Sequence, residues 1–419
     1  MKAALNGDRG GSLRRAQVAA NECWVRRLLL PRAGAGIKGP GIDFNEGTAM
    51  AHRRSLLGFT VAFATAIGVS HFASGQAPAS GPSAPAPKPT GVARIQADAA
   101  ELLPMFKTEA ARRFLQATEA LPPIEPRKVM VNNSTRAWLT PEEAAALPEE
   151  TRSGLTERIL DEQFYYNTGY GSPLVYARVL ELAALAQQTP EAPFPWTRVM
   201  DFGYGTIGQL RLMASLGCLA TGVDVDSKLA MLYREPGDQG SVPPSKASAA
   251  ARAGAVRPVT GRWPAESAAI EAVRAAGNAA PGADSAAPGF DLITSKNTLK
   301  MGYIHPSREA EKRLLVDLGV DDQTFVKAVF DALTPGGLFV IYNLSPRLSR
   351  DDEPYRPWSD GRCPFPRELL ERAGFQVLAF DQDDNEAARA IFTTLEYPVK
   401  NAAGEDDLFA LYTIARKSR

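Results

Sequence analysis

The sequence is poor in the residues on which disulfide frameworks and metal clusters depend. Its 419 residues include three cysteines and three histidines, too few for a disulfide scaffold or a multi-histidine metal site. Neither sign of charge is in excess, because 47 Lys and Arg residues balance 47 Asp and Glu residues. A net charge of zero argues against a large nucleic-acid footprint, so we expect neither a metal nor a nucleic-acid partner. Cys218 is expected to be a small buried thiol, and a bridge to Cys363 is the alternative.

A hydrophobic run long enough for a convincing membrane span is also absent. A charge-free apolar run, Gly58–Val69, follows a basic segment and precedes small residues that end at Gly75. This order is typical of a secretory signal over residues 50–75 and predicts an exported, periplasmic protein without a stable membrane span. An uncleaved membrane anchor is the alternative. The paired Arg53 and Arg54 fit twin-arginine export as well as an ordinary basic n-region.

Composition divides the remainder of the chain. Residues 1–49 have no sustained hydrophobic period and precede the signal, which indicates a disordered extension or a start codon assigned too early. Residues 76–92 are a Pro/Ala-rich linker. We predict a helical cap over residues 93–190, with a helix start at Thr140, and a larger domain over residues 191–419.

The larger domain alternates predicted strands and helices, which is typical of an α/β fold with a parallel sheet. Two Ala/Gly/Pro-rich stretches, 235–254 and 274–288, are expected to be mobile surface insertions without a core of their own. Predicted helices include 101–120, 173–187, 322–333 and 366–373, and predicted strands lie near 197–202, 218–224, 256–260, 290–295, 337–343, 375–381 and 408–415.

The stretch from Arg198 to Leu210 predicts a strand, a glycine turn and a helix start. Gly203 and Gly205 let backbone amides approach a ligand, because a Cβ would block the approach or forbid a positive φ. The helix that follows Gly208 adds the positive end of its dipole. Asp224 lies 19 residues after Gly205, at the end of the next strand, where a carboxylate can accept from both hydroxyls of a ribose. These features predict a nucleoside-binding site.

Asp201 helps to distinguish the kinds of nucleoside. The spacing of Gly203, Gly205 and Gly208 also matches the dinucleotide fingerprint. A carboxylate two residues before the first glycine would face a pyrophosphate, whereas a ligand with a sulfonium and an ammonium group favours it. The stretch Asp201–Gly205, with Asp224 downstream, resembles the first two motifs of class I S-adenosylmethionine-dependent methyltransferases.

Later segments extend this resemblance over about residues 195–419. The strand Phe290–Ser295, the turn Pro335–Gly337, the helix and strand around Gly374 and the last strand from Leu408 follow in that family's order. The resemblance implies an α/β fold with a Rossmann-like, doubly wound, mostly parallel seven-stranded sheet whose last strand is antiparallel. It also implies S-adenosyl-L-methionine as the cofactor.

In open α/β sheets, ligands bind beyond the carboxyl ends of the strands. Trp263 stands where the family commonly has an acid, and is expected either to stack on the adenine or to pack at the rim. Tyr170 lies in an aromatic turn where related enzymes place a lid over the cofactor. The predicted cofactor-binding residues are therefore Asp201, Gly203, Gly205, Gly208, Asp224, Trp263, Ser295 and Tyr170.

Three residues are candidates for catalysis. Lys296 and Asn297 stand where the family keeps substrate-facing residues. His305 is the only histidine after the predicted signal, and is expected either to be a general base or, as lone histidines more often are, a structural residue. Methyl transfer depends mainly on positioning, and a base helps only if the acceptor must lose a proton.

The leading hypothesis is a methyltransferase that acts on an unidentified small molecule. An exported, non-catalytic protein that binds a nucleoside or S-adenosylmethionine on the same fold is one alternative, because that cofactor is made in the cytosol. An NAD-dependent oxidoreductase is another alternative, and only the glycine spacing supports it. The sequence predicts neither the acceptor nor an oligomeric state.

Overall fold

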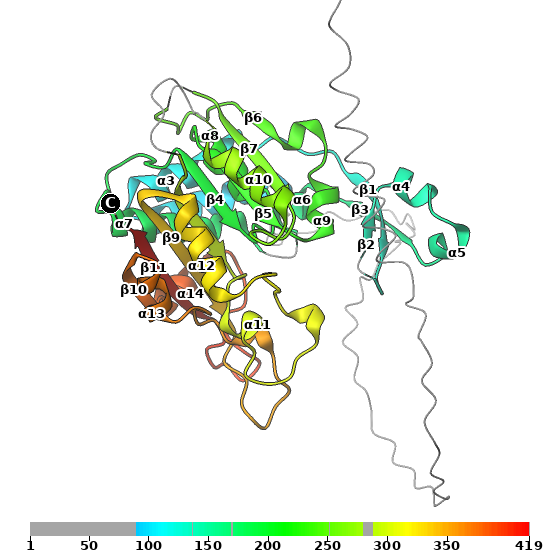
Figure 1. Ribbon diagram of the computed structural model, residues 1–419. Coiled ribbons are helices and arrows are strands. Elements are labelled where there is room, and N and C mark those ends of the chain that lie inside the picture. The colour runs from blue at the N-terminus through cyan, green and yellow to red at the C-terminus, as the bar shows by residue number, and fades with distance from the viewer. Residues whose placement is uncertain (1–88, 136, 169–170, 251, 280–287, 419) are drawn as a thin grey trace, which may run out of the picture. The chain divides into compact units, whose positions relative to one another are not determined.

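Seven apolar stretches form strands at the predicted positions, because runs of Val, Ile, Leu and Phe between turns suit a sheet buried on both faces. The computed structural model describes residues 89–135, 137–168, 171–250, 252–279 and 288–418 (Figure 1). The seven strands are β4 (Arg198–Phe202), β5 (Leu219–Asp224), β7 (Gly254–Thr260), β8 (Phe290–Lys296), β9 (Leu333–Ser345), β10 (Phe375–Asp383) and β11 (Phe409–Lys417).

These strands and one more form a sheet in the order β10-β11-β9-β8-β4-β5-β7-β6. β11 runs antiparallel to β9 and β10, whereas the contacts between β9, β8, β4, β5 and β7 are parallel. The prediction of a mostly parallel sheet with an antiparallel last strand is confirmed. Asp201 of β4 pairs with Gly222 of β5 and Thr294 of β8, so the carboxyl ends of these three strands meet at one edge.

The eighth strand, β6 (Gly240–Val242), corrects the prediction for residues 235–254. β6 pairs antiparallel with β7 at the edge of the sheet, and Val242 is buried in the main core. The prediction of an insertion without a core is therefore wrong for the middle of this stretch.

The predicted helical cap over residues 93–190 contains a small sheet in addition to its helices. The three short strands are antiparallel in the order β2-β1-β3, and β1 buries the alternating residues Val129 and Val131. Thr140 begins α4 with a capping box that includes Glu143, as its sequence predicts. The cap elements are α2 (Gly91–Leu102), α3 (Glu109–Gln116), β1 (Arg127–Asn132), β2 (Ala137–Leu139), α4 (Pro141–Ala145), α5 (Glu149–Arg152), β3 (Thr156–Leu160), α6 (Glu162–Asn167) and α7 (Tyr176–Gln187).

Helices cover both faces of the large sheet (Figure 1). On one face, the cap residues Phe114 and Leu180 share a core with Leu210 and Val340, so the cap and the larger domain pack as one structure. The second core lies under α10, α12 and α13 and contains Phe325. The remaining helices are α8 (Gly208–Ser215), α9 (Ser227–Leu232), α10 (Ser267–Gly277), α11 (Met301–Ile304), α12 (Asp322–Ala332), α13 (Arg367–Arg372) and α14 (Asn385–Thr394).

Several predictions concern parts of the chain beyond the described ranges. The extension 1–49, the signal 50–75, most of the linker 76–92 and Tyr170 lie outside them. Within the described ranges, no helix has the length and apolarity to cross a membrane. The same residues contain no group of three or more His, Cys, Asp or Glu side chains that could hold a metal ion. Cys218 and Cys363 are buried free thiols, and they form no bridge.

A buried ion cluster joins the cap to the far end of the sheet. Arg178 of α7 donates to the two carboxylate oxygens of Asp384, at 3.0 and 2.6 Å, and to Glu181 at 2.6 Å. Asp384 also accepts from the Tyr342 hydroxyl at 2.9 Å. Both acids are buried, and Arg178 is the cation that pairs with both of them.

Replacing Arg178 with methionine is expected to lower the free energy of unfolding by about 3 kcal/mol, because two buried carboxylates would lose their cation. Urea denaturation measures this loss. Arg313→Met, at an exposed ion pair, is the control and should change stability by less than about 0.5 kcal/mol. Equal effects of the two substitutions would contradict a structural role for the cluster.

Candidate functional site

The turn after β4 has a backbone conformation that favours glycine. Gly203 and Gly205 have φ angles of 73° and 58°, in the left-handed region. The Gly203 amide donates to the Val223 carbonyl at 2.8 Å, and the Thr298 hydroxyl donates to the Gly203 carbonyl at 3.2 Å. A Cβ on Gly203 would overlap the Thr298 side chain. The turn is therefore fixed between β5 and the segment after β8.

Asp224 lies beside this turn, at the carboxyl end of β5. Its Oδ1 accepts from the Asp226 amide at 2.9 Å, and the Gly205 amide is a further donor to the carboxylate. Burial, reinforced by the charge of Asp226, raises the pKa of Asp224 to about 6. The residue still keeps part of its surface exposed. A largely desolvated carboxylate that a ligand can reach suits two ribose hydroxyls.

The cap covers the N-terminus of α8. The Thr206 hydroxyl donates to the Tyr166 carbonyl at 2.5 Å. A Cβ on Gly208 would come within 2.9 Å of Pro173. Gly208 therefore permits close packing between the cap and α8, which corrects its predicted contact with a cofactor. A pyrophosphate at this helix start would need the same space, so the packing argues against a dinucleotide site.

Asp201 is fully buried and satisfied by the protein itself. Its Oδ2 accepts from Gln209 Nε2 at 2.9 Å, and its Oδ1 accepts from the Thr294 hydroxyl at 2.8 Å. Burial raises the pKa of Asp201, while hydrogen bonds that include one from the Tyr176 hydroxyl, and the positive charge of Lys296, oppose that rise. The predicted contact of Asp201 with a ligand's positive charge is therefore corrected, because the nearby cation belongs to the chain.

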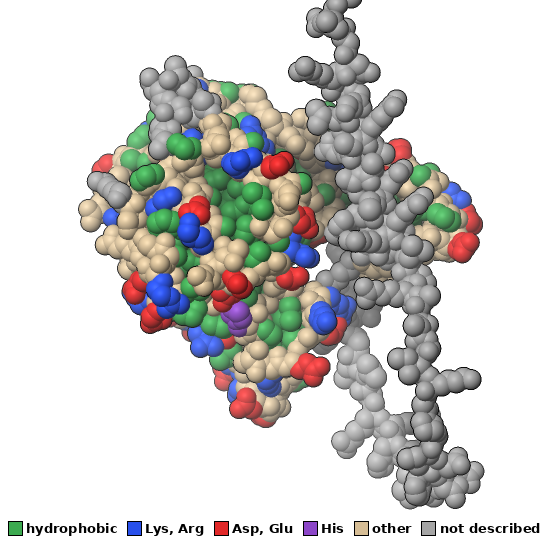
Figure 2. All heavy atoms as spheres, viewed as in Figure 1, with side chains coloured by type: hydrophobic (Ala, Val, Ile, Leu, Met, Phe, Trp, Pro, Cys, Tyr) green, Lys and Arg blue, Asp and Glu red, His purple; other side chains and the backbone are tan. Residues whose placement is uncertain are grey.

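Trp263 belongs to the core on the other face of the sheet. Its ring is 4% exposed and packs against Phe202 and Phe325, with ring centroids 6.3 and 5.9 Å apart. Of the two expected roles, stacking on adenine is corrected and packing is found, in the core rather than at the rim, because aromatic neighbours already cover the ring. Trp263 also lines a groove of about 1120 Å³, and Figure 2 shows hydrophobic side chains gathered over α10 and α12 on this face.

Ser295 is fully buried, and its hydroxyl has no hydrogen-bond partner among the described residues.

A cavity of about 280 Å³ lies beyond the ends of β8 and β9, and Lys296 and Asn297 both line it. Asn297 has a left-handed φ of 66°. Its Oδ1 accepts from the Leu344 amide at 2.7 Å, so a residue in an unfavourable conformation ties the two strand ends together. Burial lowers the pKa of Lys296 to about 8, against the opposing effect of Asp201. The predicted substrate-facing residues therefore line the cavity at this edge.

The order and direction of the strands in the large sheet identify the fold. Dinucleotide-binding folds have a parallel sheet, whereas here an antiparallel β11 lies between β9 and β10. The glycine turn follows β4, and Asp224 ends the neighbouring β5. The chain has the fold of class I S-adenosylmethionine-dependent methyltransferases.

Comparison with known proteins gives matches only among solved structures. No family model matches the sequence, and no curated protein does. Among solved structures, an S-adenosylmethionine-dependent methyltransferase from Methanosarcina mazei is 16% identical over 53% of this chain and 92% of its own, with a TM-score of 0.26. Human N-acetylserotonin methyltransferase is 14% identical over 59% of this chain and 54% of its own, with a TM-score of 0.28. A [4+2]-cyclase is 16% identical over 57% and 80%, with a TM-score of 0.30. We therefore infer function from the geometry of the site in this chain.

Lys300 is a second buried lysine near the cavity. Its Nζ donates to the Leu344 and Trp358 carbonyls at 2.5 and 3.3 Å. Burial, and the charge of Lys296, lower its pKa to about 7. Leu344 lies at the end of β9, and Trp358 lies in the loop that follows this strand. Lys300 therefore holds the loop against the end of β9.

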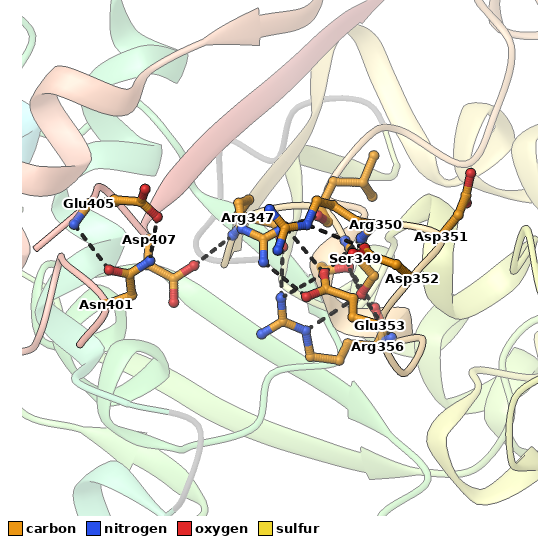
Figure 3. A network of polar contacts seen from close by, with 12 residues as sticks. Arg347, Ser349, Arg350, Asp351, Asp352, Glu353, Arg356, Asn401, Glu405 and Asp407 are labelled. Carbon is orange, nitrogen blue, oxygen red and sulfur yellow. Dashed lines mark hydrogen bonds and ion pairs between the residues drawn. The ribbon is translucent and has the colours of Figure 1, made fainter. Parts of the chain in front are cut away.

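A network of polar contacts also holds this loop (Figure 3). The Arg347 guanidinium donates to Glu353 at 3.0 Å, and the Arg347 amide donates to Asp407 at 3.0 Å. The hydrogen bond from Arg347 is the main reason that the pKa of Glu353 falls to about 2. Asp407 lines the cavity, so the network links this loop to the cavity wall ahead of β11.

His305 lies outside the cavity. Its Nε2 is 2.8 Å from Asp322 Oδ2, in a contact whose side chains are both partly exposed to solvent. This position corrects the predicted role as a general base and agrees with the structural alternative. Tyr170, the predicted lid, lies outside the described residues.

No sequence motif marks the walls of the cavity. Val175, Phe392 and Leu408 line it from three segments that lie far apart in the chain. Their only sequence signal is apolar character, which ordinary core residues share. Asp407 carries a weak signal, since an acid just ahead of the last strand lies at the end of the sheet where ligands bind.

Proposed function

We propose that this protein is an S-adenosylmethionine-dependent methyltransferase that acts on a small molecule. The observation that carries the proposal is the placement of Asp224 beside the turn Gly203–Gly205, at the sheet edge where Lys296 ends β8. A nucleoside site and a cavity of about 280 Å³ would then share one edge. This volume is at the lower end of the range for small-molecule sites.

The residues at this edge fit the cofactor. Asp224 supplies a carboxylate for the ribose hydroxyls, and the left-handed turn at Gly203 and Gly205 lets the backbone approach closely. When bound, the cofactor supplies an electrophilic methyl group on a sulfonium. The task of the chain is to orient the acceptor, through Lys296 and Asn297, and to exclude water with the apolar walls of the cavity.

Calorimetric titration of the full chain with S-adenosylhomocysteine and with NAD tests this proposal. We expect S-adenosylhomocysteine to bind and NAD not to bind, because the cap occupies the start of α8. Binding of NAD alone would overturn the proposal. Binding of S-adenosylhomocysteine without methyl transfer to any small molecule of a cell extract would favour the non-catalytic alternative.

Cofactor binding is also expected to depend on pH through Asp224. Ribose hydroxyls donate to the ionised carboxylate, so binding favours the deprotonated form of Asp224. The pKa of Asp224 in the free protein is about 6. Affinity for S-adenosylhomocysteine should therefore be flat above pH 7 and fall as the pH drops through 6, by about tenfold at pH 5. Titrations across this range measure the dependence. Asp224→Asn is the control, and a variant that kept the same pH profile would assign the dependence to another group.

A further inference from the structure

The cavity beyond β8 and β9 has a lining of polar and apolar side chains. Lys296 and Asn297 line it together with apolar residues that include Val175, Phe392 and Leu408, and its other polar lining residues are Ser172, Ser345, Tyr397 and Asp407. Asn297 Oδ1 already accepts from the Leu344 amide, whereas its Nδ2 has no acceptor among the described residues. Lys296 and Asn297 therefore both line the cavity with donors for which the described residues supply no acceptor.

Lys296 is a buried cation whose hydrogen bonds are not satisfied by the described part of the chain. The residue is 9% exposed, and its pKa is set by burial and by the charge of Asp201 without any hydrogen bond. Its Nζ lies 5.5 Å from the ring centroid of Tyr176, a cation–π contact that leaves the N–H donors unpaired. Lys300 differs, because it donates to two carbonyls. A buried ammonium with free donors calls for an acceptor.

The charges around Lys296 leave a positive surplus. Asp201, the carboxylate whose charge acts on Lys296, already accepts from Gln209 and Thr294, and Lys300 is a second buried cation close enough for the charge of Lys296 to lower its pKa.

Among the described residues that line this cavity, Asp407 is the only acid. Its Oδ1 accepts from the Arg347 amide, and the Arg347 guanidinium interacts electrostatically with Asp407 (Figure 3). The Arg347 guanidinium, which is paired with Glu353, offsets part of the charge of Asp407, and Asp201 rather than Asp407 is the carboxylate whose charge acts on Lys296.

We propose that the cavity binds acceptors that carry one carboxylate next to a small apolar body, with the carboxylate accepting from Lys296 Nζ and Asn297 Nδ2. This inference rests on the proposed function only in taking the ligand to be the methyl acceptor. The single positive charge of the Lys296 ammonium balances the single negative charge of a carboxylate, and the Asn297 amide supplies a further hydrogen-bond donor. A phosphate would call for more donors, such as an Arg fork or a helix N-terminus.

Calorimetry on the full chain with benzoate, its neutral isostere benzamide and inorganic phosphate tests the proposal. At pH 7, where Lys296 is mostly protonated, we expect wild-type protein to bind benzoate at least tenfold more tightly than benzamide or phosphate. Lys296→Met should lower benzoate affinity at least tenfold. Lys327→Met, which removes an exposed lysine of α12, should leave it unchanged. The wild-type comparison does not depend on whether Lys296→Met folds.

Equal binding of benzoate and benzamide, or unchanged benzoate binding in a folded Lys296→Met variant, would overturn the proposal. Tighter binding of phosphate than of benzoate would also overturn it. A parallel titration with S-adenosylhomocysteine separates the two levels of inference. If that ligand binds and benzoate does not, the carboxylate site fails alone. If benzoate binds and S-adenosylhomocysteine does not, the proposed function fails and the carboxylate site stands.

Discussion

Asp224→Ala is expected to weaken the binding of S-adenosylhomocysteine by about 2 kcal/mol, roughly 30-fold, because two ribose hydrogen bonds to a charged acceptor would be lost. The carboxylate ends β5 beside the glycine turn, where Gly205 and Asp226 amides orient it. Burial has already removed most of its hydration, so bound hydroxyls replace little water. Calorimetric titration at pH 7.5 measures the loss.

The control for this prediction is an acid on another element. Asp322→Ala removes a carboxylate on α12 that contacts His305, and it should leave affinity within a factor of about two. Asp224→Asn should show most of the loss, since it keeps the shape and removes the charge. Unchanged affinity in both Asp224 variants would mean that the ribose lies elsewhere.

Asp201→Asn is expected to lower the free energy of unfolding by about 3 kcal/mol, because it removes the buried negative charge beside Lys296. Asn would also present an amide where Asp201 now accepts from Gln209 and Thr294. Urea denaturation at pH 7 measures the change. The effect should fall by at least about 1 kcal/mol in a Lys296→Met background, because the cation that depends on Asp201 is then absent.

The same variants separate a supporting role of Asp201 from direct ligand contact. Equal stability losses in the two backgrounds would show that Asp201 and Lys296 are not coupled. Such a result, combined with a large loss of S-adenosylhomocysteine affinity, would restore the ligand contact that the sequence predicts for Asp201.

The large sheet could be predicted because its signals are local. β4 and β8 are apolar runs bounded by turns, and the acid at the end of β5 follows from the spacing to the glycine turn. β6 could not be predicted, since three residues in a Gly/Ser/Pro-rich stretch carry no period and gain their structure only by pairing with β7. The cap strands β1 to β3 are similarly short and depend on one another.

The predicted helix over residues 101–120 shows the limit of periodicity. Its apolar spacing is real, but the chain leaves the α-helix after Leu102, and α3 begins only after Thr108. Pro104 lies in this break and lacks an amide for continued helical hydrogen bonding. Thr108 then caps α3, accepting from the Ala111 amide at 3.4 Å, so the predicted helix contains only the last two residues of α2 and then, after the break, α3.

The residues of the site could likewise be predicted only in part. Gly203, Gly205 and Asp224 belong to one continuous motif, and the structure places them together. The partners of Asp201 and the packing of Trp263 depend on residues brought close only by folding, such as Lys296 and Phe325. A sequence pattern can therefore place a carboxylate at a strand end, but it does not tell whether a ligand or a lysine will neutralise it.

The most direct test of the account is a crystal structure of the full chain with S-adenosylhomocysteine. We expect the ribose hydroxyls to donate to Asp224, the backbone of Gly203 to Gly205 to contact the ligand, and the sulfur to face the cavity lined by Lys296. A ligand bound away from Asp224, or one whose sulfur faces away from that cavity, would contradict the account.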